Sequence, residues 1–452
     1  MVPAFEEDVM KIKSFHDLNQ YFTDEMMVRQ YVAKRLEADH IRTSFPKEIE
    51  ELVAGDFGSI NHCNRKDLTD ESSFTIDCSE TQDMDDAISV SKSDDGYLVR
   101  VHIADVASYV GHGSGLEAEA MLRGSSVYLP GITIPMLPPV LTNELCSLNP
   151  GVNRNAITAE ILIDGSGDVI GYKLFKSIIR SRVKGVYSEV NALLAGMGGA
   201  TLRKKYSEVH DEIIMLDELA TKLNKKRIAN GAVTGCRPFG AVRFVNGQVV
   251  IEARENGRAE SLVEELMILA NTVVAEFFVM HDMPAVMRSQ AKQGELAEYT
   301  DGRIGHSSLA LSHYVHFTSP IRRFADLRVH QILSDKLDGA TTEELKGCYA
   351  DCMEETYLAA TKGARRARSI QNACNKYAYC KYMSKRSNER FTGEVVGRDC
   401  KGRYLVRLKD LGISVIASRI ANAREGLKLV CKVGVDFDNN IMYARCISTL
   451  AA

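Results

Sequence analysis

The sequence predicts an α+β protein with a short helical N-terminal segment, a central domain of mixed sheets with surrounding helices, and a small C-terminal β-barrel of the OB type. Three observations predict this fold class. Apolar residues follow helical spacing in 1–60, follow strand patterns in much of 74–180, and form about five short strands in 390–449. The expected parts of the chain are 1–67, 68–385 and 386–452.

The composition is that of a folded protein, since 45% of the 452 residues are hydrophobic and 26% are charged. The most apolar long stretch, 262–280, contains three glutamates, so we expect no transmembrane span. The N-terminus lacks the basic region and apolar core of a secretory signal. Eleven cysteines without a Cys-x-x-Cys pair suit free thiols in a reducing compartment, which predicts a cytoplasmic protein.

The N-terminal segment is predicted to form two helices. Apolar residues recur at helical spacing from Val28 to Leu36, and a second short helix follows Pro46. The central domain opens with strands, because the turn signal at 94–96 predicts a hairpin that leads into a strand at 97–103.

Repeated prolines make 129–151 a rigid, irregular loop that is long enough to suggest a functional role. Residues 156–180 are predicted to return to strands. Helices predominate from about residue 187, and Asn246-Gly247 predicts a hairpin between two of them. The main helices are expected at 205–229, 259–280 and 341–384.

Five short strands are predicted near the C-terminal end of the chain, and their length and spacing indicate a small OB-type barrel. They are expected at 391–396, 404–408, 413–416, 429–435 and 442–447. Phe391, Tyr404 and Phe437 would offer flat faces for stacking on bases, although packing inside the barrel is the commoner role for an aromatic side chain.

The strongest chemical signal is a cluster of aspartates within ten residues, just before a predicted strand. Its members are Asp77, Asp83, Asp85 and Asp86. Converging carboxylates repel one another unless protons or cations relieve the repulsion. Mg²⁺ and Mn²⁺ prefer oxygen ligands, and two such ions about 4 Å apart form a clamp for phosphoryl transfer. An acidic surface loop is the alternative that the cluster alone leaves open.

A second signal is the segment 318–323, which contains Pro320 and Arg322. Thr or Ser followed by Pro predicts the start of a helix, and a helix N-terminus favours an anion. A guanidinium group at that position makes a forked phosphate site, whereas simple capping with an exposed arginine is the alternative.

A third signal is the pair Glu264-Glu265 at the start of the helix predicted at 259–280. Ser261 and Glu264 match a capping box, which is a structural role. Because this helix is apolar on nearly all sides, Glu265 is expected to be either a buried charge or a residue of the site.

Two tyrosines lie beside turn-rich or basic sequence, Tyr128 in the proline-rich loop and Tyr187 after two arginines. Either ring could stack on a base, and core packing is the alternative for each. No Gly-x-Ser-x-Gly, Walker or Gly-x-Gly-x-x-Gly motif occurs, and the histidines lack zinc-ligand spacing. Serine hydrolase, NTPase and dinucleotide chemistry therefore have no support.

Together these segments resemble the signature of the ribonuclease II family, whose catalytic unit is the RNB domain. The matching motifs follow the family's order within 68–384, and the predicted barrel fits the small RNA-binding barrel that follows this domain. The motifs lie at 74–87, 102–106, 126–131, 145–150, 263–271 and 316–323.

The resemblance implies a hydrolytic 3′→5′ exoribonuclease that degrades single-stranded RNA processively to nucleoside 5′-monophosphates, with Mg²⁺ or Mn²⁺ as cofactor and no membrane partner. The metal ligands that it implies are Asp77, Asp83, Asp85 and Asp86. Among them Asp85 is expected to be the least replaceable.

The same resemblance assigns the residues that bind RNA. Arg322 matches the arginine that grips the phosphates, and Tyr187 matches the tyrosine that positions the 3′-terminal nucleotide, so both join Asp85 as catalytic residues. Tyr128 matches one wall of an aromatic clamp, and Glu264 matches a glutamate that reads terminal riboses. Thr318 and Arg323, on either side of Arg322, complete the RNA-binding set.

Three features depart from the family pattern. Bacterial members usually carry two cold-shock barrels ahead of the RNB domain, and residues 1–67 are too few for both. The second clamp aromatic is expected near 233–236, which contains none, and Phe239 is the nearest substitute. A glutamate expected in the basic stretch 361–390 falls at Gln371, a loss of charge that would affect product release.

Two rival hypotheses stay open at this point. An RNA-binding or regulatory protein could keep the fold without turnover, which the departures favour and the four aspartates and Arg322 oppose. A DNA nuclease or phosphodiesterase could use the same metal chemistry, and RNA and DNA oligomers of one sequence would separate that case.

Overall fold

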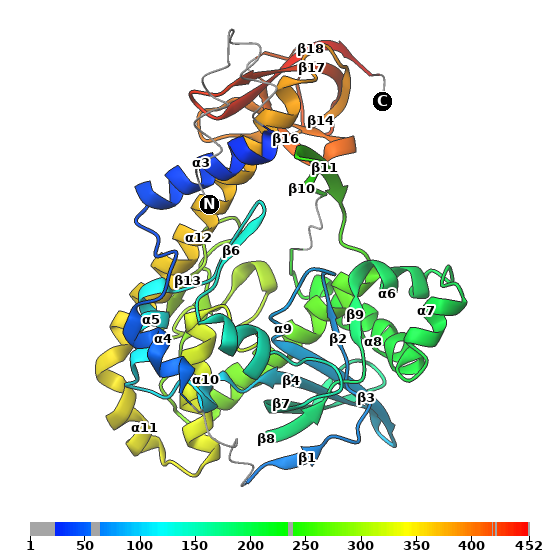
Figure 1. Ribbon diagram of the computed structural model, residues 1–452. Coiled ribbons are helices and arrows are strands. Elements are labelled where there is room, and N and C mark those ends of the chain that lie inside the picture. The colour runs from blue at the N-terminus through cyan, green and yellow to red at the C-terminus, as the bar shows by residue number, and fades with distance from the viewer. Residues whose placement is uncertain (1–22, 56–63, 234–237, 418, 421–422, 451–452) are drawn as a thin grey trace.

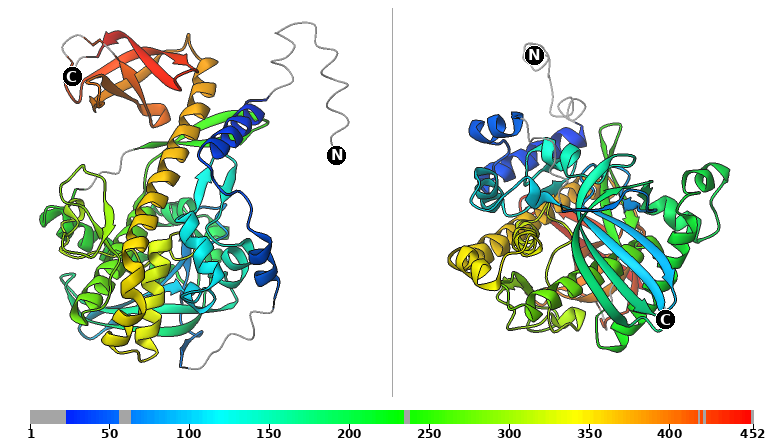
Figure 2. Two further views of the ribbon diagram at one scale, coloured as in Figure 1. Left: turned by 90° about the vertical axis from the view of Figure 1, so that its left-hand side faces the viewer. Right: turned by 90° about the horizontal axis from the view of Figure 1, so that it is seen from below.

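The structure of the protein is a computed structural model that describes residues 23–55, 64–233, 238–417, 419–420 and 423–450. The predicted α+β fold class is confirmed. A large lower body is built around a mixed sheet, and a small β-barrel lies above it (Figure 1). One long helix, α12 (Met353–Ser384), rises from the lower body to the barrel and links the two parts (Figure 2).

The lower body is organised around a five-stranded sheet in the order β1-β8-β7-β4-β3, in which only the β1–β8 pairing is parallel. Val99, Val101 and Ile103 of β4, which lies between β7 and β3, are fully buried. The strands are β1 (Lys66–Leu68), β3 (Asp86–Ser93), β4 (Gly96–Ala104), β7 (Asn153–Asp164) and β8 (Val169–Arg180). The predicted hairpin at 94–96 and the strands in 156–180 are confirmed.

Two helices, α8 (His210–Ala229) and α9 (Arg258–Met280), pack against each other and against strands of the sheet. They confirm the helices predicted at 205–229 and 259–280. Buried Leu262 and Leu266 of α9 belong to the same hydrophobic cluster as the sheet, so α9 is held firmly on the body. The other helices are α5 (Gly115–Arg123), α6 (Tyr187–Leu194), α7 (Ala200–Lys205), α10 (Phe324–Leu337) and α11 (Thr342–Tyr349).

Four two-stranded ribbons accompany the sheet in the described part of the chain. They are β2 (Thr75–Asp77) with β9 (Lys184–Val186), β5 (Val127–Leu129) with β6 (Ile132–Ile134), β10 (Phe239–Val245) with β11 (Gln248–Arg254), and β12 (Met287–Ser289) with β13 (Glu298–Thr300). The predicted hairpin at Asn246-Gly247 is the β10–β11 turn, where both residues have positive φ values of 50° and 73°.

The irregular loop predicted at 129–151 is more ordered than expected. It contains the β5–β6 turn, strand β6 and a π-helical turn at Val140–Leu145. Leu137, Leu141 and Leu148 of this segment are buried in a hydrophobic cluster with α5 and α10 residues, which explains the order.

The two predicted N-terminal helices are confirmed as α3 (Asp24–Ala38) and α4 (Lys47–Ala54). Val28, Val32 and Leu36 of α3 are buried in a cluster that also contains residues of β5, β11, α12 and the barrel. Tyr31 stacks on Tyr377 of α12, with ring centroids 4.1 Å apart. The helix α3 therefore braces the barrel against the body.

The predicted barrel is closed, in the strand order β14-β15-β16-β18-β17. All five predicted strands are confirmed, as β14 (Phe391–Arg398), β15 (Tyr404–Leu408), β16 (Ile413–Ala417), β17 (Lys428–Asp436) and β18 (Ile441–Thr449). Phe391 packs in the core, whereas Phe437 is exposed and carries Lys381 over its ring at 4.7 Å.

Two negative expectations can be compared with the structure. Across the described residues, no helix has both the length and the apolar character needed to span a bilayer. Each cysteine of the described part is a free thiol, as the cysteine pattern predicts.

Candidate active site

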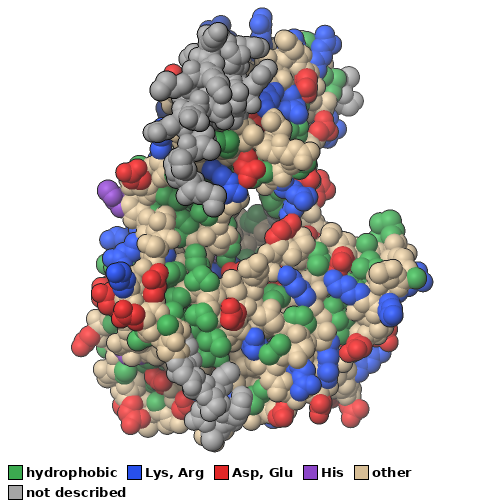
Figure 3. Space-filling model, viewed as in Figure 1, with side chains coloured by type: hydrophobic (Ala, Val, Ile, Leu, Met, Phe, Trp, Pro, Cys, Tyr) green, Lys and Arg blue, Asp and Glu red, His purple; other side chains and the backbone are tan. Residues whose placement is uncertain are grey.

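One cavity of about 480 Å³ gathers every site residue predicted from the sequence, and we call it the site cavity. The space-filling view shows the molecule deeply hollowed between the barrel-bearing part and the lower body (Figure 3). The predicted residues in the wall of the site cavity are Asp77, Asp83, Asp85, Asp86, Tyr128, Tyr187, Glu264, Thr318, Arg322 and Arg323.

Strand pairing places the aspartates beside one of the tyrosines. Asp77 is the last residue of β2 and pairs with Val186 of β9 in a parallel register. Tyr187 follows at once as the first residue of α6. Asp86 is the first residue of β3, so the loop between β2 and β3 carries Asp83 and Asp85 around the cavity.

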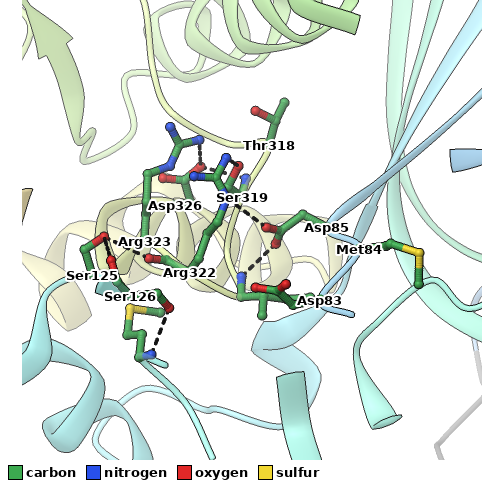
Figure 4. Close-up of polar contacts among 12 residues, drawn as sticks. Asp83, Met84, Asp85, Ser125, Ser126, Thr318, Ser319, Arg322, Arg323 and Asp326 are labelled. Carbon is green, nitrogen blue, oxygen red and sulfur yellow. Dashed lines mark hydrogen bonds and ion pairs between the residues drawn. The ribbon is translucent and has the colours of Figure 1, made fainter. Parts of the chain in front are cut away.

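Asp85 links the aspartate cluster to the arginine-bearing segment (Figure 4). Its side chain is buried, and Oδ1 accepts a 2.8 Å hydrogen bond from the backbone N–H of Ile321. Its other oxygen, Oδ2, lies 3.4 Å from Nε of Arg322. The neighbouring carboxylate of Asp83 is also held, because its Oδ2 accepts a 3.0 Å hydrogen bond from the hydroxyl of Tyr128.

The segment 318–323 forms a turn ahead of a helix, and the prediction that it is the first turn of a helix is wrong. The helix α10 begins at Phe324. The backbone N–H of Ser126 donates to the carbonyl of Arg322 at 2.9 Å, and Phe324 donates to the carbonyl of Gly124 at 3.1 Å. Because these groups pair with the neighbouring segment, they are unavailable for helical hydrogen bonds.

The two arginines of this turn have different surroundings. The Arg323 guanidinium donates to Oδ1 of the fully buried Asp326 at 2.7 Å, so it is committed to an ion pair inside the fold. The side chain of Arg322 is 42% exposed, and among the described residues it donates only to Ser319 Oγ, at 2.7 Å, beside its contact with Asp85. Arg322 is therefore the arginine that is free to meet an anionic group in the cavity.

Burial and mutual repulsion dominate the electrostatics of the aspartates. Burial, then the charges of Asp85 and Asp83, raises the pKa of Asp77 to about 7. Burial and Asp77 raise the pKa of Asp86 to about 7 as well. Burial raises the pKa of Asp85 well above its usual range, although Arg322 opposes this shift. A cation in the cavity would relieve this repulsion.

The donor chemistry of the cavity fits a hard divalent cation. Four carboxylates line one cavity, and carboxylate oxygens are the ligands that Mg²⁺ and Mn²⁺ prefer. The four carboxylates are not arranged as a closed metal site in the structure. Among the described residues, no three Asp, Glu, His or Cys side chains lie close enough to hold an ion.

The adjacent residues Glu264 and Glu265 of α9 have separate roles. Glu265 is buried and accepts hydrogen bonds from the guanidinium of Arg227 at 2.5 Å and from Asn224 at 2.6 Å. Of the two roles expected for it, Glu265 therefore has that of a buried, paired charge. Glu264, on the next position, is 52% exposed and lines the site cavity. Burial raises the pKa of Glu264.

The predicted capping box of Ser261 and Glu264 is wrong. The helix α9 begins earlier, at Arg258, and Oε2 of Glu260 accepts from the backbone N–H of Gly257. The extra turn forms because Asn191 of α6 accepts a 2.9 Å hydrogen bond from the N–H of Ala259. This contact satisfies a backbone donor that would otherwise be unpaired at the helix start.

Some predicted features lie outside the cavity. The segment 234–237, which includes most of the expected second clamp wall, lies outside the described residues. Phe239 is 50% exposed on β10, and neither it nor Gln371 of α12 is among the residues that line the site cavity.

Sequence reasoning missed two buried residues that support the site. Oδ1 of Asn271 accepts from the backbone N–H of Phe317 at 2.7 Å, and Asn271 itself lines the cavity. Oδ1 of Asp326 accepts from the N–H of Ser319 at 2.8 Å. Asn271 lies two helical turns after Glu264, and this i, i+7 spacing on α9 is the signal that could have identified it.

The chain is similar to known proteins along most of its length. The model of the RNB domain matches residues 65–296 and 294–339. Ribonuclease R of Thermotoga maritima is 37% identical over 326 residues, which cover 60% of this chain and 46% of that protein. The chain spans about half the length of such curated relatives.

Two solved structures share the fold. Mycoplasma genitalium RNase R, in complex with ribose-methylated single-stranded RNA, superimposes with a TM-score of 0.82 at 22% identity and covers 93% of this chain and 78% of its own. Yeast Ssd1, a pseudonuclease, superimposes with a TM-score of 0.59 at 19% identity and covers 84% and 52%. The RNB model matches more than half of the residues of this chain, so the chain belongs to the RNB family.

Proposed function

We propose that this chain is a metal-dependent 3′→5′ exoribonuclease that hydrolyses single-stranded RNA processively and releases nucleoside 5′-monophosphates. The observation that carries the proposal is the site cavity, in which the four aspartates meet Tyr128, Tyr187 and the partly exposed Arg322. Membership of the RNB family supports the assignment of RNA as the substrate.

In this proposal Asp77, Asp83, Asp85 and Asp86 would hold Mg²⁺ or Mn²⁺, which when bound would supply an activated water and charge stabilisation at the scissile phosphate. The protein provides the rest of the environment. Tyr128 fixes the orientation of Asp83 through its 3.0 Å hydrogen bond. Arg322 offsets negative charge that builds on the phosphate, because its guanidinium group faces the cavity beside Asp85.

The remaining lining residues would hold the RNA. The rings of Tyr128 and Tyr187 are available for the terminal nucleotide, and Glu264 would accept hydrogen bonds from its ribose hydroxyls. Thr318 and Arg323 complete the wall beside Arg322. We also propose a division into an N-terminal segment at 1–67, a catalytic unit at 68–385 and an RNA-binding barrel at 386–452, and a cytoplasmic location.

The test is a 5′-labelled single-stranded RNA of about 20 nucleotides incubated with the protein and Mg²⁺, with products identified by mass spectrometry. Nucleoside 5′-monophosphates should accumulate, EDTA should stop their release, and added Mg²⁺ should restore it. A duplex with a 3′ overhang reports direction and stalling in the same assay. Absence of monophosphates with both Mg²⁺ and Mn²⁺ would overturn the proposal.

A second candidate is an RNA-binding protein of the same fold with weak or no turnover. The open spacing of the carboxylates in the described residues favours it, and so does the fold shared with a pseudonuclease. RNA binding that is unaffected by EDTA, without release of monophosphates, would select this candidate.

A further inference from the structure

A second cavity of about 480 Å³ lies directly beside the site cavity. It is bounded by the start of α6, the end of β11 and the loop that follows β2. Tyr187 and Cys78 line both cavities, so these two residues lie at the boundary between the two spaces. We call this space the second cavity.

Tyr187 lies at this boundary. Burial raises the pKa of Tyr187, and Asp86 and Asp77 in the site cavity and Glu260 in the second cavity add to the shift. The phenol of Tyr187 therefore interacts electrostatically with carboxylates of both cavities. A molecule that occupies the site cavity beside Tyr187 is one side chain away from the second cavity.

The charges of the second cavity leave one cation uncommitted. Arg243 pairs with Glu252 at 3.4 Å. Glu260 accepts hydrogen bonds from the N–H of Gly257 at 2.9 Å and from the Asn191 amide at 2.8 Å. Within the described part of the chain, the side chain of Arg254 forms no hydrogen bond or ion pair, and its charge acts on the exposed Cys78 and on Glu80.

We propose that the second cavity is the exit route of the released nucleoside 5′-monophosphate, with Arg254 as its transient phosphate contact. The inference rests on the proposed function, which produces one such molecule per cleavage. A nucleoside monophosphate carries a charge near −2 at neutral pH and can meet a single guanidinium group.

The surrounding acids explain why this route would carry product and not RNA. Glu80 and Glu255 line the same wall as Arg254, so a polyanionic strand would be repelled there. The same acids keep the product contact weak, which suits a molecule that must leave before the next cleavage. The RNA chain would therefore reach the site cavity from another side.

Cys78 is a reporter for this test, because its exposed thiol lines both cavities. The full chain is treated with iodoacetamide in EDTA, with and without millimolar AMP, and alkylation of each cysteine is measured by peptide mass spectrometry. Exposed Cys348 on α11 and Cys400 in the barrel serve as internal references. AMP should slow the alkylation of Cys78 and leave both references unchanged.

Substitutions of three arginines by Gln, at Arg254, Arg243 and Arg322, locate the bound AMP. Arg254→Gln should raise the AMP concentration needed for protection about tenfold, the loss expected for one charge-assisted hydrogen bond. Arg243→Gln is the matched control and should leave protection unchanged, because Arg243 is already paired. Each variant is compared with itself without AMP, so that any change in thiol reactivity cancels.

The outcomes separate this inference from the proposed function, because no RNA is hydrolysed in the assay. Absence of protection would show that millimolar AMP occupies neither cavity and would overturn the exit route. Protection that is lost in Arg322→Gln and kept in Arg254→Gln would place AMP in the site cavity alone and would also overturn it. Protection that depends on Arg254 supports the nucleotide site even if RNA hydrolysis fails in the separate activity assay.

Discussion

The backbone N–H of Ile321 donates a 2.8 Å hydrogen bond to Oδ1 of Asp85, although 236 positions separate the two residues in the chain. This bond holds the turn that carries Arg322 against the aspartate loop. The carboxylate of Asp85 therefore serves both parts of the site, since its other oxygen faces the guanidinium group of Arg322. A substitution of Asp85 should therefore affect both the aspartate loop and the turn that carries Arg322.

Replacement of Asp85 by Asn should separate activity from stability. Asn keeps the oxygen that accepts from Ile321 and removes a buried charge that its surroundings disfavour. RNA hydrolysis should fall at least about 100-fold, the scale of losing one electrostatic group at a reacting centre. The thermal midpoint should rise, because the folded state no longer holds an unfavourable charge.

The matched control is Asp94→Asn in the exposed β3–β4 hairpin, which should change neither quantity. Both variants are measured by RNA hydrolysis and by circular dichroism melting. Wild-type activity in Asp85→Asn would contradict the role assigned to this carboxylate.

Much of this site could be predicted because its residues are grouped in short motifs. The loop from Asp77 to Asp86 and the turn from Thr318 to Arg323 each bring several functional side chains together within ten residues. The barrel strands could also be predicted, because the alternation of apolar and polar residues along a strand is visible in the local sequence.

What could not be predicted depends on contacts between distant segments. The turn at 318–323 is not helical because Arg322 and Phe324 pair with 124–126, almost 200 residues away in the chain. The helix α9 starts at Arg258, ahead of the predicted capping box of Ser261 and Glu264, because Asn191 of α6 accepts a hydrogen bond from the N–H of Ala259. Such tertiary hydrogen bonds leave no periodic signal in the sequence.

The two neighbouring arginines should respond differently to substitution. Arg323→Gln removes one partner of a buried ion pair and leaves the carboxylate of Asp326 without its cation, at a cost of about 3 kcal/mol in the free energy of unfolding. Arg322→Gln should cost little stability, since its side chain is 42% exposed, and should instead weaken RNA hydrolysis. Urea denaturation and the RNA assay measure the two effects.

Equal losses of stability in the two arginine variants would contradict this distinction. Arg322→Lys is a useful companion, because it keeps the charge and loses the planar fork. It should recover only part of the activity that Arg322→Gln loses.

The adjacent glutamates of α9 offer a second matched pair. Glu265→Gln should lower the free energy of unfolding by about 3 kcal/mol, because the buried guanidinium of Arg227 loses its 2.5 Å ion pair and keeps, among the described residues, only the 3.9 Å contact with Glu264. Glu264→Gln should leave stability nearly unchanged. Its expected effect is a loss of about tenfold in the preference for RNA with a 3′-terminal ribose over the same RNA with a terminal deoxyribose.

The preference is measured as the ratio of hydrolysis rates for the two substrates. If Glu264→Gln slows both substrates equally, Glu264 does not read the terminal hydroxyls.

Acid should destabilise the protein through a buried histidine of the central sheet. His102 is fully buried, with Nε2 3.1 Å from Ser89 Oγ and Nδ1 2.9 Å from Thr158 Oγ1. Burial, aided by the charge of Arg100, lowers the pKa of His102 to about 3. The folded protein therefore keeps this imidazole neutral at pH values where the unfolded chain, with a pKa of about 6.5, binds a proton.

The sign of the effect follows from this difference in proton binding. The stabilising contribution is complete above about pH 6.5 and is lost progressively as the pH falls toward 3. At pH 5 the loss from this one residue should be about 2 kcal/mol, from about 1.4 kcal/mol per pH unit.

His102→Gln cannot take up a proton, so the dependence of its thermal midpoint on pH between 6.5 and 5 should be shallower than in the wild type. The control is His40→Asn, at an exposed position whose φ of 51° suits Asn, and it should keep the wild-type dependence on pH. Identical pH profiles for His102→Gln and the wild type would show that His102 takes up its proton as readily in the folded protein as in the unfolded chain, against the neutral imidazole that its burial favours.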